Sequence, residues 1–111
     1  MDHSSTLLII ADDWEALERY EERLALHFEV HCAPFGVTGL EMARELKPNR
    51  ILIDLVFEDM NVAEALSELK NAGSLVQTVV VSDINIELSE YEKVKLLTRP
   101  FDFQELIEHL R

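Results

Sequence analysis

The residues of this chain that could do chemistry stand at the ends of four apolar runs: Asp12 with Asp13, then Asp54, Ser82 and Arg99. Asp54 is the most informative of them, because the run Arg50–Val56 is apolar on both alternations, as in a strand buried on both faces. An ionised carboxylate inside such a strand is costly unless it meets a cation, hydrogen-bond donors or solvent at the strand's end. Open parallel sheets place their ligands at that end. The sequence therefore predicts a functional site around Asp54.

The chemistry follows from which side chains would meet there. In the doubly wound order 2-1-3-4-5 the first and third strands are neighbours, so Asp12, Asp13 and Asp54 would converge at one edge of the sheet. Carboxylates that close either raise one another's pKa or bind a cation, and an oxygen-only ligand set favours Mg²⁺. A metal beside the Ser82 hydroxyl and the Arg99 guanidinium suits phosphoryl transfer, with Asp54 as the nucleophile.

The remaining sequence supplies the elements that would position these side chains. Strand-type runs at about 6–11, 28–33, 50–56, 76–81 and 94–98 alternate with helical spacing at about 14–26, 40–46, 61–72 and 102–110. The segment Ile84–Glu92 is short and poorly patterned, so the fourth of five expected helices is predicted to be shortened. Alternation with short connections predicts right-handed crossovers and a single α/β domain over residues 1–111, with a five-stranded parallel sheet covered on both sides.

Local signals mark where several helices begin and which way they face. Asn61 is a candidate cap for the helix that follows it, and Asp102 with Glu105 predicts a capping box for the last helix. Leu17, Tyr20 and Leu24 share one face of the first helix and are predicted to be buried in the core. Asp12 or Asp13 could also serve as a cap for that helix, and Asp54 could be only a structural partner of Arg99.

Composition narrows the classes of function. The chain has 111 residues, 48% of them hydrophobic, a formal net charge of −12 and a pI of about 4.6. Such a charge repels phosphate backbones and anionic membranes, which argues against direct nucleic-acid binding and membrane binding and favours a metal cation or a basic protein partner. The single Cys32 is interpreted as a small buried hydrophobe, and a lone cysteine without a signal peptide or membrane span favours the cytoplasm.

These residues resemble the response-regulator receiver domain of two-component signalling over essentially the whole chain. Asp12-Asp13 matches the family's acidic pair, Asp54 its phosphoacceptor, and Ser82 its switch hydroxyl. Arg99-Pro100-Phe101 matches a Lys-Pro-Phe motif whose proline usually follows a cis peptide bond. The resemblance implies the flavodoxin-like strand order 2-1-3-4-5, Mg²⁺ as cofactor, and a histidine kinase or phosphotransfer protein as the phosphate donor.

The chain departs from the family at several of its positions. Arg99 replaces the lysine, Asp83 stands where a small residue is usual, and Leu96 stands where an aromatic switch residue is expected. Glu58 replaces a proline of the loop after the third strand. Ser82 and Arg99 are 99 − 82 = 17 positions apart, a few fewer than the family typically has, which is why the fourth helix must be short.

The resemblance implies a phosphorelay receiver that accepts phosphate on Asp54 and changes its binding surface for an output protein or domain. At most, such a domain catalyses its own phosphorylation and dephosphorylation. A second copy of the chain is a further candidate partner. The alternative is a pseudo-receiver, an interaction module that phosphate does not switch, which Asp83, Leu96 and Arg99 favour. A free-standing metal-dependent phosphatase is a remote third class, because the chain is too short for a substrate-binding insertion.

Overall fold

A computed structural model describes residues 5–56 and 60–111, so the predicted loop position Glu58 lies outside the described residues. The elements, in chain order, are β1 (Thr6–Ala11), α1 (Trp14–Leu24), β2 (Glu29–Ala33), α2 (Gly36–Leu46), β3 (Arg50–Asp54), α3 (Val62–Asn71), β4 (Gln77–Ser82), β5 (Val94–Thr98) and α4 (Phe103–Leu110). Most boundaries lie within two residues of the predicted ones. The second helix begins earlier than predicted, at Gly36, and β3 ends at Asp54 and not at Val56.

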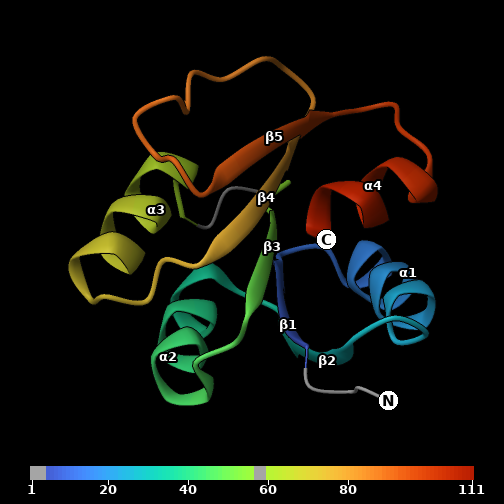
Figure 1. Ribbon diagram of the computed structural model, residues 1–111, viewed down its shortest axis with the longest axis horizontal. Helices are drawn as coiled ribbons and strands as arrows, with labels where there is room; N and C mark the ends of the chain where they lie inside the picture. The colour runs from blue at the N-terminus through green and yellow to red at the C-terminus, as the bar shows by residue number, and fades with distance from the viewer. Residues whose placement is uncertain (1–4, 57–59) are drawn as a thin grey trace.

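The strands form one parallel sheet in the order β2-β1-β3-β4-β5, with α1 and α4 on one side and α2 and α3 on the other (Figure 1). This confirms the predicted order and makes β1 and β3 neighbours. Their register pairs Ala11 with Asp54, the last residue of each strand, and Asp12 follows directly after β1. Asp12, Asp13 and Asp54 therefore lie at the same edge of the sheet.

The alternation of side chains in each strand divides the core in two. In β1, Leu7 and Ile9 belong to the cluster under α1 and α4, whereas Leu8 and Ile10 belong to the cluster under α2 and α3. The same two-residue period in β3 places Leu52 on the α1 side and Ile53 on the opposite side. Asp54 shares the parity of Leu52, which directs its side chain toward α1 and α4.

Capping fixes the starts of three helices. Asp13 accepts a hydrogen bond from the Glu15 amide at the start of α1, and Asn61 accepts from two amides at the start of α3. Asp102 and Glu105 form the predicted capping box of α4. These contacts satisfy backbone N–H groups that have no partner inside the helix.

No helix occupies the connection from β4 to β5, so the predicted shortening of the fourth helix is complete. Residues 83–93 form bends, turns and irregular backbone. Ile86, Leu88 and Tyr91 nevertheless pack against the cluster on the α2–α3 side. Apolar residues recur here at every second or third position, which is not the periodicity of a helix. They still cover the α2–α3 side of the sheet. Across the described ranges, no helix has the length and apolar character needed to cross a membrane.

Candidate phosphoacceptor site

Asp54 ends the central strand β3 with its carboxylate at the floor of a cavity. Its side chain is 2% exposed. The cavity has a volume of about 480 Å³, and the polar residues that line it are Asp13, Arg19, Tyr20, Asp54, Asp83 and Arg99. The sequence expected a charged cluster at this edge, and the structure places Asp54, Arg99 and Asp13 around one cavity.

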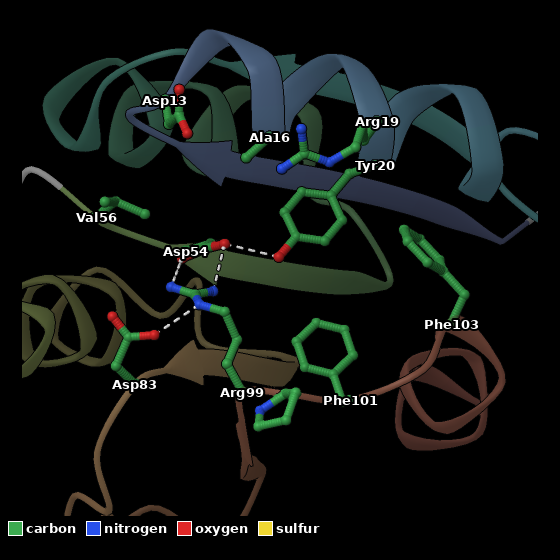
Figure 2. A pocket seen from close by; sticks show the side chains of 11 residues that line it. Asp13, Ala16, Arg19, Tyr20, Asp54, Val56, Asp83, Arg99, Phe101 and Phe103 are labelled. Atoms are coloured by element: carbon green, nitrogen blue, oxygen red, sulfur yellow. Dashed lines mark hydrogen bonds and ion pairs between the residues drawn. The ribbon is translucent and has the colours of Figure 1, made fainter.

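Both carboxylate oxygens of Asp54 are hydrogen-bonded (Figure 2). Arg99 approaches from the end of β5 and donates from Nη1 to Oδ2 at 3.0 Å and from Nη2 to Oδ1 at 3.1 Å. Tyr20 points inward from α1 and donates its hydroxyl proton to Oδ2 at 2.7 Å. A planar guanidinium matches a carboxylate in this two-pronged way, so the buried charge is compensated.

Tyr20 is a site residue that the sequence assigned only to the core. Its ring is buried as predicted, but its hydroxyl reaches the carboxylate of Asp54. Burial, followed by the negative charge of Asp54, raises the pKa of Tyr20 well above its ordinary value. The hydroxyl therefore stays protonated and remains a donor. A tyrosine among the core positions of a helix beside a buried carboxylate is the one signal that could have indicated this contact.

Asp83 gives Arg99 a second anchor. Nε of Arg99 donates to Oδ1 of Asp83 at 2.8 Å, so one guanidinium bridges the two carboxylates (Figure 2). Partial burial disfavours the charged form of Arg99, but the hydrogen bonds and charges of Asp54 and Asp83 outweigh it and raise the arginine pKa. Asp83 and Arg99, two of the residues that differ from the family pattern, therefore contact each other.

The acidic pair after β1 has other bonds in this arrangement. Oδ1 of Asp12 accepts the backbone N–H of Val56 at 2.6 Å, which ties the end of β1 to the loop after β3. Oδ1 of Asp13 accepts the N–H of Glu15 at 3.3 Å, so the capping role that the sequence allowed is present. Asp13 also lines the cavity beside Asp54.

The oxygen donors here fit a hard cation such as Mg²⁺ in chemical type. Within residues 5–56 and 60–111, however, no group of three or more His, Cys, Asp or Glu side chains lies close enough to hold a metal ion. Arg99 neutralises Asp54 in this arrangement. A metal that used Asp54 would have to take one of the two oxygens that Arg99 now contacts.

Ser82 is the last residue of β4. Its Oγ accepts the N–H of Ile84 at 3.1 Å, and the residue lines a neighbouring cavity of about 290 Å³ together with Asp83 and Arg99. The peptide bond between Arg99 and Pro100 is cis, as the resemblance predicted. Leu96, at the position of the absent aromatic, is half-buried and packs against the α2–α3 side of the core.

No family model matches the chain. Its sequence is 24% identical over 106 residues to the regulatory protein AtoC of Escherichia coli strain K12, a match that covers 90% of this chain and 23% of AtoC. The chain thus spans about a quarter of that relative. Among solved structures, the receiver domain of the Francisella response regulator 1452 superposes with a TM-score of 0.82 at 18% identity, covering 96% of this chain and 93% of that one.

A second solved structure agrees with the first. The CheY-like response regulator receiver domain protein from Methanospirillum hungatei JF-1 has a TM-score of 0.81 at 19% identity and covers 97% of this chain and 92% of its own. This chain has the fold of a response-regulator receiver domain. In that fold the carboxyl edge of the sheet carries the acidic cavity described above, and the receiver-like core is retained although one helix is absent.

Proposed function

We propose that this receiver-like chain accepts a phosphoryl group on Asp54 and passes the change to a protein partner. One observation carries the proposal: a carboxylate that is 2% exposed ends the central strand and forms part of an open cavity beside a guanidinium. A buried carboxylate without function would gain nothing from access to such a cavity. The fold and the distant relationship to AtoC support the same function.

The cofactor in this proposal is Mg²⁺, and Asp12, Asp13 and Asp54 would hold it once their side chains turn toward one another, since no three such side chains of the described residues lie close enough as they stand. A bound Mg²⁺ would neutralise the phosphoryl oxygens and orient the phosphate donor for in-line transfer. Asp13 already lines the cavity, and Asp12 accepts the backbone N–H of Val56, a residue that also lines it. Arg99 would then leave one oxygen of Asp54 and remain on the other.

Arg99 and Ser82 have separate roles in the proposal. Arg99 reaches the acceptor carboxylate directly, so its guanidinium is placed to pair with a phosphoryl group attached there. Ser82 would donate its hydroxyl proton to the phosphoryl oxygens, for which its side chain must turn away from the Ile84 amide. Because Leu96 cannot make the usual aromatic rotation, the signal to a partner must travel by another route.

The proposed donor is a histidine kinase or a phosphotransfer protein, and the proposed output is a protein or domain that binds one state of Asp54. A second copy of this chain is a further partner to test. The proposed location is the cytoplasm, where a lone cysteine such as Cys32 stays reduced.

The rival function is a pseudo-receiver that binds a partner regardless of phosphate. The hydrogen bonds from Arg99 and Tyr20 suit such a module, because they give the Asp54 carboxylate hydrogen-bond partners without any ligand. The comparisons do not favour it, since the neighbours by fold are receiver domains of response regulators.

Acetyl phosphate with millimolar Mg²⁺ tests the function directly. The expected result is a mass gain of one phosphoryl group in the intact protein that is lost in Asp54→Asn. Asp102→Asn is the matched control, because it makes the same change at a helix cap where Asn also serves. Equal labelling of the Asp54→Asn variant, or none in the wild type, would refute the proposal and leave the interaction module.

Metal binding is measured separately through Trp14, which is 64% exposed and directly follows Asp13. Saturable quenching of its fluorescence by Mg²⁺ is expected. Asp12→Asn and Asp13→Asn should each weaken the response, and Asn at position 13 still caps α1, so the helix is not at risk. Quenching that is unchanged in both variants would remove these side chains from the metal site.

A further inference from the structure

The proposed function assigns no role to the contact between Tyr20 and Asp54. The hydroxyl donates to Oδ2 at 2.7 Å, a shorter distance than either contact from Arg99. The ring is held between the core and α4, where the Phe103 ring lies 6.1 Å away, centroid to centroid. Figure 2 shows the Tyr20 hydroxyl and the Arg99 guanidinium meeting the carboxylate from different elements.

We infer that the Tyr20 hydroxyl shortens the lifetime of the phosphoryl group on Asp54 by stabilising the free carboxylate. This inference rests on the proposed function. It assigns to an α1 residue the control of how long the phosphorylated state persists.

The two oxygens of Asp54 are not equivalent. Oδ2 accepts from both Tyr20 and Arg99, whereas Oδ1 accepts only from Arg99 among the contacts described. Each donor draws electron density from the oxygen it contacts, so Oδ1 is the better nucleophile. A phosphoryl group on Oδ1 leaves Oδ2 as the carbonyl oxygen of the mixed anhydride, still facing Tyr20.

Phosphorylation converts the negatively charged carboxylate of Asp54 into a neutral carbonyl group, and hydrolysis restores the negative charge. Water attacks phosphorus, and the bond from phosphorus to Oδ1 breaks with its electron pair passing to Oδ1. Inorganic phosphate leaves with the oxygen and one proton of the water, and the other proton is released to solvent. The negative charge regained by the carboxylate is shared by Oδ2. A hydrogen bond to an ionised acceptor is stronger than one to a neutral carbonyl, so Tyr20 stabilises the leaving carboxylate more than the anhydride.

The fixed position of the Tyr20 ring supports this role. The ring is fixed by core contacts that do not depend on the hydroxyl, since Tyr20 belongs to the cluster under α1 and α4. Removing only the hydroxyl therefore alters the bond and leaves the packing in place.

The test compares the wild type with Tyr20→Phe and with Tyr91→Phe. Tyr91 is the only other tyrosine, it lies outside the acidic cavity, and its loss of a hydroxyl is the matched control. Each protein is loaded with acetyl phosphate and Mg²⁺, the donor is removed, and the decay of the phosphorylated form is followed by intact mass. The lifetime is expected to lengthen about three- to tenfold in Tyr20→Phe, from the difference between charged and neutral hydrogen bonds, and to stay unchanged in Tyr91→Phe.

The direction separates this role from a structural one. A loosened site admits water and shortens the lifetime, so an equal or shorter lifetime in Tyr20→Phe would overturn the inference. If the wild type is not labelled at Asp54, the proposed function fails and the inference falls with it. Labelling with unchanged decay refutes the inference alone.

A graded variant covers the case in which Tyr20→Phe folds poorly. In the Tyr91→Phe background Tyr20 is the sole tyrosine, so 3-fluorotyrosine fed during expression enters only there. Fluorination makes the phenol a stronger donor without changing its shape appreciably, and the lifetime is expected to shorten. A longer or unchanged lifetime with the fluorinated residue would contradict the inference independently of Tyr20→Phe.

Discussion

Asp83 and Asp54 share the guanidinium of Arg99: Oδ1 of Asp83 accepts Nε–H at 2.8 Å while the two Nη atoms contact Asp54. The arginine is thereby shared between a buried carboxylate and one that is 75% exposed. This sharing explains why a guanidinium occupies the position where the family has lysine, since a compact ammonium lacks the planar fork for both carboxylates.

Arg99→Lys is expected to lower the free energy of unfolding by about 1–3 kcal/mol, because part of the hydrogen bonding to a buried charge is lost. The same change should tighten Mg²⁺ binding, since an ammonium leaves one oxygen of Asp54 open. Urea melts with and without Mg²⁺, together with Trp14 fluorescence, measure both effects. Arg44→Lys on the exposed side of α2 is the control, and unchanged Mg²⁺ affinity in Arg99→Lys would show that Arg99 does not compete with the metal.

Asp83→Asn removes a negative charge at the cavity while leaving an oxygen that can accept from Arg99. The unfolding free energy should change by less than about 1 kcal/mol, because the Asp83 carboxylate is 75% exposed. The rate of labelling by acetyl phosphate should rise several-fold, since the negative charge of Asp83 no longer repels the anionic donor, and the gain should shrink at high salt. Asp102→Asn provides the same change in charge away from the cavity. A slower rate in Asp83→Asn would mean that anchoring Arg99 matters more than repulsion.

Gly39 allows α2 to approach the sheet closely. A Cβ at this position would lie 2.7 Å from side-chain carbons of Ile10, which is itself buried in β1. Gly39→Ala is therefore expected to destabilise the fold by about 1–3 kcal/mol through overpacking. Thermal or urea unfolding measures the loss, with Glu41→Ala on the exposed side of the same helix as control. In an Ile10→Ala background the cost should largely disappear, and an undiminished cost would place the clash elsewhere.

Cys32 should be a poor nucleophile at neutral pH. Burial, with a smaller effect of the Glu21 charge, raises its pKa from 9.0 to about 11. Since only the thiolate reacts, alkylation by iodoacetamide at pH 8 should be about 100-fold slower in the folded than in the urea-unfolded chain. The rate should climb with pH until about pH 11. Because the folded state holds this proton longer than the unfolded state, the thiol also makes stability fall as pH rises from 9.0 to about 11. Equal rates at pH 8 would show an exposed thiol.

The sheet, and the edge of it that carries the cavity, could be predicted from the residue pattern alone. Two-faced apolar runs require strands covered on both sides, and the residues that end those runs must then lie at one edge, as Asp54 and Arg99 do. Caps such as Asn61 and Asp102 are local, since each bonds to amides within three residues, and local signals can be read directly from a sequence.

The hydrogen-bond partners of the Asp54 carboxylate could not be predicted from residue types and are known from the packed structure. Tyr20 is 34 positions away from it and Arg99 is 45 positions away, and whether their polar atoms meet depends on how α1 and β5 pack. The periodicity of α1 indicates that Tyr20 faces the core, but it does not indicate which group its hydroxyl contacts. Likewise, the short span before Arg99 indicated a reduced helix, but whether any helix forms there depends on how Leu88 packs against the sheet. Hydrogen bonds between side chains of distant elements depend on packing geometry, which residue types alone do not specify.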